Sequence, residues 1–190
     1  MNNFVRYSVL CLVACFLASC AATKFSEQEI KQLENLVTDA SFKIESDWAN
    51  PMLTTGLASL QNSGFFNVNG NSLTNINITG NSNYFRIEKD SVFANLPYFG
   101  ERQLPGNYGA RDIGISFKSK ARNLKKYKAK NGSYKISFTV NDGNYSNESY
   151  NLIVQVFPNM SSNISVNSSH RTPIDYRGRV IKSVDSSSQN

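Results

Sequence analysis

The order of hydrophobic and polar residues divides the chain into three parts. Residues 8–17 form an almost continuous apolar run, and residues 25–40 carry an apolar side chain at every third or fourth position. From residue 42 onward, most segments alternate apolar and polar residues. These patterns are typical of a leader segment, an amphipathic helix and half-buried β-strands, respectively. The sequence therefore predicts an N-terminal apolar segment, one helix and a β-rich domain.

The segment Phe25–Ala40 has the signals of a helix that covers the rest of the domain. Ser26 and Glu29 have the spacing of a capping box, in which each side chain bonds to the backbone N–H of the other residue. Phe25 and Ile30 fit the hydrophobic staple that accompanies such a start. We expect a helix that begins near Ser26 and buries one apolar stripe. The stripe consists of Ile30, Leu33, Leu36, Val37 and Ala40.

Alternating segments predict a series of strands joined by tight turns. In the first strand, the alternation places Trp48 on the same face as Phe42 and Ile44. A short helix is expected within residues 52–60. The expected strands cover residues 42–48, 73–78, 84–88, 92–96, 113–120, 134–141, 150–157, 163–167 and 174–184.

Short strands in series, without alternating helices, favour an all-antiparallel architecture over a parallel α/β fold. The predicted fold class is mainly β: an antiparallel meander that forms a small barrel or a sandwich. The N-terminal amphipathic helix would cover one open end or face of it.

The first twenty residues fit a bacterial secretory signal peptide that ends at a lipid-attachment cysteine. Arg6 precedes an apolar run that is shorter than the roughly 20 residues a membrane-spanning helix needs. The triplet Leu-Ala-Ser at residues 17–19, directly before Cys20, is similar to the bacterial lipobox. A leader cleaved after Ala21 or Ala22, without lipid, is the alternative.

This interpretation sets the domain organisation. Residues 1–19 are the lipoprotein signal peptide, and residues 20–24 are a lipid-anchored spacer. Residues 25–184 form a single β-rich domain with its helix, and residues 185–190 form a Ser-rich disordered tail. The spacer reaches only about 15–20 Å when fully extended, so we expect the domain to sit close to the bilayer.

The amino-acid composition argues against several kinds of functional site. The chain holds 20 Lys and Arg against 14 Asp and Glu, so it is mildly basic. Its three cysteines are Cys11, Cys15 and Cys20, which leaves the mature domain without a thiol for a disulfide, a metal or a nucleophile. His170 is the only histidine, which supports neither a multi-histidine metal site nor a His-paired nucleophile. We expect no metal and no cofactor.

Two polar segments are assigned to turns. Residues 142–148 resemble a calcium-binding loop, but Gly143 stands at the second position instead of the sixth. We therefore predict a hairpin turn there. His170 and Arg171 are expected to serve a turn before the last strand, with Arg171 bound to carboxylate or main-chain carbonyl groups.

Several short motifs, in their order and spacing, resemble those of one protein family. The motifs are Asp47–Met52, Leu96–Arg102, Gly114–Phe117, Ser168–Arg171 and Tyr176–Val180. With them, the mature chain resembles the Bacteroidetes lipoprotein family named domain of unknown function 4251, as a flavobacterial-type member. The resemblance implies lipid anchoring in the cell envelope, and it implies no activity.

Aromatic residues near Pro97 are the candidates for ligand binding. If the barrel end holds a pocket, its residues are expected to be Trp48, Tyr98, Phe99 and Tyr108. In the alternative interpretation, Pro97 sets a turn while Tyr98 and Phe99 plug the end of the barrel.

Eight basic residues gather between Lys118 and Lys135. Such a segment could dock on anionic lipid headgroups, with Lys125, Lys126 and Lys128 as the expected contacts. The alternative is a solvated hairpin loop whose lysines keep a sheet edge from aggregating.

Together these observations define two hypotheses. In the first, the protein is a lipid-anchored, non-enzymatic binding or interaction module of the cell envelope, facing the periplasm from the outer membrane. Its partner would be an envelope protein or a glycan, and nucleic acid is not expected. In the second, the barrel carries a small apolar or glycan ligand in an aromatic pocket at its end.

Overall fold

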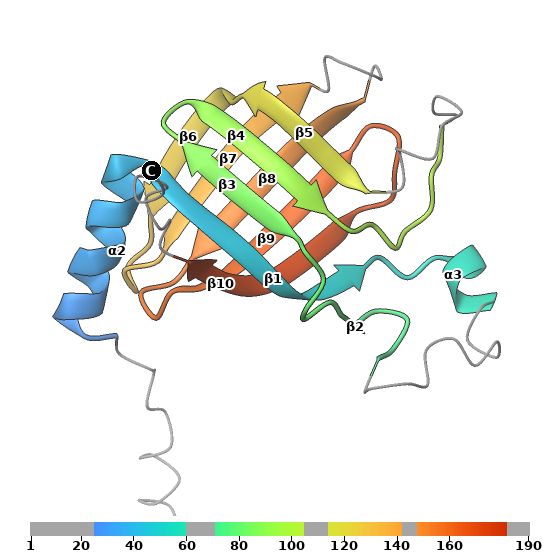
Figure 1. Ribbon diagram of the computed structural model, residues 1–190, viewed down its shortest axis with the longest axis horizontal. Helices are drawn as coiled ribbons and strands as arrows, with labels where there is room; N and C mark the ends of the chain where they lie inside the picture. Colours follow the sequence, from blue (N-terminus) through green and yellow to red (C-terminus); the bar gives the residue numbers. More distant parts are fainter. Residues whose placement is uncertain (1–24, 60–70, 105–113, 142–147, 182–190) are drawn as a thin grey trace, which may run out of the picture.

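The computed structural model describes residues 25–59, 71–104, 114–141 and 148–181. Its strands form one antiparallel sheet that curls into a nearly closed barrel, with a helix across one end (Figure 1). The predicted fold class is confirmed. The helices are α2 (Glu27–Asp39) and α3 (Thr55–Ser59). The strands are β1 (Ser41–Pro51), β2 (Ile76–Asn77), β3 (Tyr84–Glu88), β4 (Ser91–Leu96), β5 (Ile115–Lys120), β6 (Arg122–Lys128), β7 (Tyr134–Asn141), β8 (Ser149–Val156), β9 (Ser161–Ser168) and β10 (Ile174–Ile181).

The sheet consists of two meanders that the first strand joins. The strand order is β5-β4-β3-β1-β10-β9-β8-β7-β6, and β2 pairs with β1 beside this path. The first strand therefore lies between β3 and the last strand, β10. Strands β5 and β6 stand at opposite ends of this order, yet only Ala121 separates them in the chain. The sheet must curl to bring its two ends together there.

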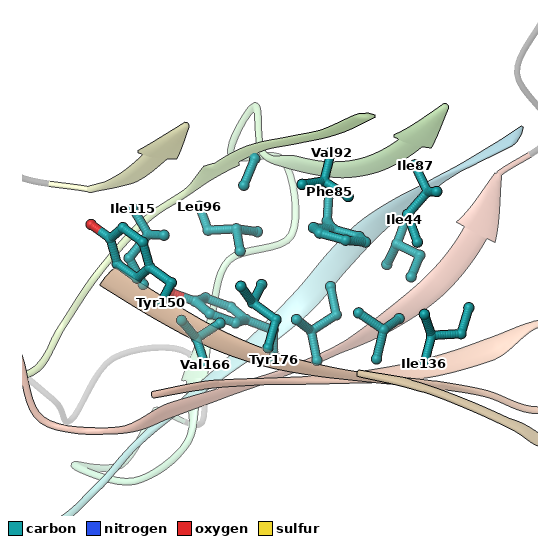
Figure 2. Close-up of a cluster of buried hydrophobic side chains, with 14 of the residues drawn as sticks. Ile44, Phe85, Ile87, Val92, Leu96, Ile115, Ile136, Tyr150, Val166 and Tyr176 are labelled. Atoms are coloured by element: carbon teal, nitrogen blue, oxygen red, sulfur yellow. The ribbon is translucent and has the colours of Figure 1, made fainter. Parts of the chain in front are cut away.

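The two walls of the barrel face each other across an apolar core. Phe85 and Leu96 project from one wall toward Tyr150 and Tyr176 of the other (Figure 2). Phe85 of β3 stacks on Phe138 of β7, with ring centroids 6.0 Å apart. These contacts join residues distant in sequence, so the core depends on the curl of the sheet.

A β-bulge in β1 corrects the expected orientation of Trp48. Phe42, Ile44 and Ser46 are buried as predicted, but the register against β10 shifts between Ser46 and Trp48, and Ala49 takes the next buried position. A bulge inserts one residue and turns the following side chains to the other face. Trp48 is therefore half-buried on the outer face of the sheet.

Asn83 and Gly178 provide the hydrogen bonds and the space that the backbone around the bulge needs. The Asn83 side chain accepts a hydrogen bond from Ser46 N and donates one to Ser46 O, both at 3.0 Å. Gly178 lies opposite Ser46, and a Cβ at Gly178 would stand 2.0 Å from the Glu45 carbonyl oxygen. Only glycine allows β10 to approach β1 this closely.

Helix α2 closes one end of the barrel (Figure 1). The predicted capping box is present: Ser26 N donates to Glu29 Oε2 at 2.8 Å, and Glu29 N donates to Ser26 Oγ at 3.2 Å. Of the apolar stripe, Leu33 and Val37 are buried in the core. Ala40 adopts a left-handed conformation with φ 47°, and it turns the chain directly into β1.

No strand was expected between residues 120 and 134, and this prediction is wrong because β6 lies there. Residues 122–128 pair with β7 along a hairpin, although all seven are exposed. Because β6 buries neither face, it has no alternation of apolar and polar residues to reveal it. The strand expected at 73–78 is limited to β2, and the hairpin turn expected at 142–148 lies largely outside the described residues.

Replacement of Gly178 tests the close approach of the two strands. Gly178→Ala should lower the free energy of unfolding by about 1–3 kcal/mol, because the new methyl group forces β1 and β10 apart. Urea denaturation followed by circular dichroism measures it.

Ser162→Ala is the control, since Ser162 pairs with Gly178 and its buried hydroxyl has no hydrogen-bond partner within the described residues. It should be neutral or slightly stabilising. Equal stability of Gly178→Ala and wild type would contradict the steric argument.

Candidate functional site

Two loops meet at the end of the barrel opposite α2. The chain after β4 pairs with the segment between β9 and β10: Gln103 N donates to His170 O at 2.7 Å, and Thr172 N donates to Glu101 O at 2.9 Å. A further bridge joins Arg102 and Arg171. These contacts hold the two loops together across the barrel end.

A buried carboxylate lies at the centre of this end. Glu148 is 1% exposed; its Oε1 lies 2.9 Å from Arg171 Nε and its Oε2 lies 3.3 Å from Arg102 Nη2. The Ser168 hydroxyl also donates to Oε1. A charge is stable in such a place only when it is paired and hydrogen-bonded. Arg171 was expected to bind carboxylate or main-chain carbonyl groups, and the ion pair confirms the carboxylate. No sequence pattern pointed to Glu148 as its partner.

Tyr98 and Phe99 pack into the same end. The Tyr98 hydroxyl oxygen lies 2.9 Å from Thr172 O and 3.0 Å from Glu101 O, and its ring lies 5.1 Å from the Arg171 guanidinium. Burial raises the pKa of Tyr98, so its phenol stays protonated as a donor. Phe99 packs against the apolar core. Both side chains therefore plug the barrel end, as the alternative interpretation of this segment has it.

The structure does not bring the four aromatic candidates together. Tyr98 and Phe99 share the plugged end, whereas Trp48 lies on the outer face of β1, opposite Arg177 of β10 and Asn77 of β2. Tyr108 lies outside the described residues. Whether any of them binds a ligand stays a prediction.

Two clefts open on the outer surface of β1 and β10. The first, of about 540 Å³, lies between the β1 bulge and the loop at residues 79–82, and the ion pair between Asp47 and Arg179 (2.9 Å) stands at it. The second, of about 320 Å³, crosses five strands. It is lined by Asn50, Lys135, Ile153, Gln155, Asn163, Ser165, Asp175, Tyr176 and Arg177.

Two of the three lysines expected to face an anionic surface are bound to α2 instead. Lys126 Nζ donates to the Val37 carbonyl at 2.7 Å, and Lys128 Nζ lies 3.0 Å from Glu34 Oε2. The hydrogen bond from Lys128 lowers the pKa of Glu34. Lys125 is exposed and has no such contact among the described residues.

Among the described residues, few side chains could bind a metal ion or take part in histidine chemistry. No group of three or more His, Cys, Asp or Glu that could hold a metal ion occurs within it. The His170 Nδ1 atom lies 2.7 Å from the neighbouring Ser169 hydroxyl, and Ser169 Oγ accepts a hydrogen bond from Ser149 N. His170 thus belongs to the turn before β10, as the sequence predicted. No described helix is long and apolar enough to cross a membrane.

These features define a class: a small, nearly closed antiparallel β-barrel, capped by a helix at one end and by an ion-paired loop plug at the other. Residues 24–180 match the family described as Domain of unknown function (DUF4251), and the chain belongs to this family.

A solved structure agrees with this fold. The crystal structure of a DUF4251 family protein from Bacteroides eggerthii DSM 20697 superposes with a TM-score of 0.52. The match covers 81% of this chain and 87% of that chain, at 9% sequence identity, so it supports the fold alone. No curated protein matches the sequence.

Removal of the central carboxylate charge tests the plug. Glu148→Gln should lower the free energy of unfolding by about 3–5 kcal/mol, because it leaves Arg171 buried without its counter-charge. Urea denaturation measures the loss.

Glu88→Gln is the matched control, since Glu88 pairs with Arg86 at the surface. An exposed pair contributes at most about 1 kcal/mol. If both variants lose the same small amount, the buried network does not hold the loops.

Proposed function

We propose that the protein is a non-enzymatic binding or interaction module of the bacterial cell envelope, attached to the outer membrane through acyl chains on Cys20. The proposal is supported by the signal-peptide pattern of residues 1–20 and by the resemblance to a lipoprotein family. Two or more acyl chains on one cysteine make such attachment stable, whereas a single chain gives marginal binding.

The observation that carries the proposal is the arrangement of the basic hairpin along α2. Lys126 contacts Val37, Lys128 contacts Glu34, and a Cβ at Gly132 would stand 2.8 Å from Ile30 Cγ1. The contacted helix residues are Val37, then Glu34, then Ile30, each nearer the N-terminus of α2 than the one before. Strand β6 and the turn after it therefore run toward the helix N-terminus. The basic turn and the start of the domain therefore lie at the same end of the barrel.

This arrangement supports an orientation at the membrane. The chain between Cys20 and Phe25 reaches about 15–20 Å at most, so an anchored Cys20 keeps the α2 end near the lipid headgroups. Lys125 and Lys130 are exposed on the same hairpin, where they can approach anionic headgroups. The plugged end and the walls of the barrel then face away from the bilayer, and no acidic run follows Cys20, which favours the periplasmic side.

The buried charges fit a binding role better than a catalytic one. Glu148, Arg102 and Arg171 bind one another and hold the two loops of the plug, so their charges stabilise the fold. Recognition of a partner is then assigned to the outer surface of the barrel.

Lipid attachment is tested by metabolic labelling. In cells grown with labelled palmitate, Cys20→Ala should lose the label and leave the membrane fraction, because the acylated sulfur is gone. Cys15→Ala, which changes a cysteine of the leader, should keep both. Persistent labelling of Cys20→Ala would contradict the anchor.

The membrane orientation is tested with the unlipidated domain and vesicles of phosphatidylglycerol. Lys125→Gln combined with Lys130→Gln should weaken vesicle binding about 25-fold, at about 1 kcal/mol for each lysine. These two positions are chosen because Lys126 and Lys128 also hold α2, so their replacement would disturb the fold.

Vesicles of phosphatidylcholine serve as the control surface, and circular dichroism checks that the variant is folded. Binding of the folded variant at wild-type strength to the anionic vesicles would reject this orientation.

A further inference from the structure

The outer face of the wall formed by β7, β8, β9, β10 and β1 carries polar side chains in register. One row across these five strands places neighbouring residues opposite one another in the ladder. It consists of Lys135, Gln155, Asn163, Arg177 and Trp48. The next row on the same face consists of Ser137, Ile153, Ser165, Asp175 and Asn50. The second cleft is lined by four residues of each row, and Trp48 and Ser137 are not among its lining residues.

Most polar groups of this cleft are available to a ligand. Among the described residues, no hydrogen bond or ion pair engages the side chains of Lys135, Gln155, Asn163 or Asp175. Gln155 and Asn163 are half-buried, so the wall of the sheet restricts the positions that their amides can take. Each amide offers both donors and an acceptor. The cleft therefore presents several hydrogen-bonding groups that no described residue engages.

Arg177, at the edge of the cleft, is held in place by asparagines. Its Nε donates to Asn50 Oδ1 at 3.0 Å, and its Nη2 donates to Asn75 Oδ1. Asn50 Nδ2 in turn donates to Asn75 Oδ1 at 2.9 Å and to Thr74 O at 2.7 Å. A side chain supported in this way is ordered before a ligand arrives, which lowers the entropy lost on binding.

Trp48 adds an aromatic surface beside this arginine. It is the only tryptophan of the chain, and the bulge in β1 turns it outward to the position opposite Arg177. The indole is half-buried, and its N–H has no partner among the described residues. A flat apolar ring with a free donor at its edge suits a ligand that has both C–H faces and hydroxyl groups.

The chemistry of the cleft selects the kind of ligand. Ile153 is the one aliphatic side chain that faces outward among its lining residues, so a large apolar partner finds little to bury there. Lys135 and Arg177 are balanced in part by Asp175, which disfavours a strongly anionic partner. Amides, hydroxyls and one aromatic ring match a neutral chain of sugars, whose units repeat on a scale close to the strand spacing of about 4.8 Å.

We propose that the outer wall of the barrel binds a neutral glycan chain, with Gln155 and Asn163 bonded to its hydroxyl groups and Trp48 stacked on a pyranose ring. This inference deepens the proposed function, because it names the partner of the binding module. It does not depend on Cys20, so the unlipidated domain is sufficient to test it.

The single tryptophan makes the experiment specific to this wall. The unlipidated domain is titrated with gluco-, xylo-, manno- and N-acetylglucosamine hexasaccharides at up to millimolar concentration, and Trp48 fluorescence is recorded. At least one hexasaccharide should shift the emission. Gln155→Ala combined with Asn163→Ala should weaken that binding about tenfold or more, from the loss of two hydrogen bonds.

Asn95→Ala is the matched control, since Asn95 is exposed on the outer face of β4 in the opposite wall. It should bind like the wild type. Calorimetry with Trp48→Ala, checked for folding by circular dichroism, should show weaker binding of the same sugar.

Two results would overturn the proposal: no response to any of the four sugar classes, or equal binding by the Gln155 and Asn163 variant. Loss of the lipid anchor in Cys20→Ala would leave the sugar titration unchanged, so the two proposals fail separately.

Discussion

The pairing of the first strand with the last is the constraint on which the rest of the barrel depends. Strand β1 joins the meander β3–β4–β5 to the meander β6–β10, and without the β1–β10 ladder the two would be separate sheets. The pairing joins residues far apart in sequence: the ion pair between Asp47 and Arg179 spans 132 positions. Loop closure over such a distance costs entropy and makes folding slow relative to helical proteins, so the ladder must be favourable along its whole length.

The two ends of the barrel are closed by different kinds of interaction. At one end, α2 inserts Leu33 and Val37 into the core, while Lys126 satisfies a carbonyl of its last turn. At the other end, Glu148 gathers arginines from two loops in a buried network. The first closure rests mainly on apolar burial, and the second depends on complete pairing of charges. The described side chains therefore close both ends of the barrel, one by apolar packing and the other by ion pairs.

Sequence patterns predicted the features that local residues determine. The capping box and apolar stripe placed α2, and alternation placed most of the core strands. Strand β6 was missed because it buries no face, and Trp48 was assigned to the wrong face because the bulge depends on Gly178, which is 130 positions away. Glu148 was missed because its partners, Arg102 and Arg171, belong to other segments of the chain. The candidate site therefore depends on contacts between distant segments, which no local pattern reveals.

The direct passage from α2 into β1 has a mechanical consequence. Ala40 alone separates the helix from the strand, so a pull on the chain before Phe25 is transmitted through α2 into the central strand of the sheet. Strand β1 is bonded along both edges, to β3 and to β10, and the hydrogen bonds lie perpendicular to its axis. Tension along β1 loads these bonds together, in shear, and does not open them one at a time. An external pulling force is therefore borne by β1, where the hydrogen bonding between strands is most extensive.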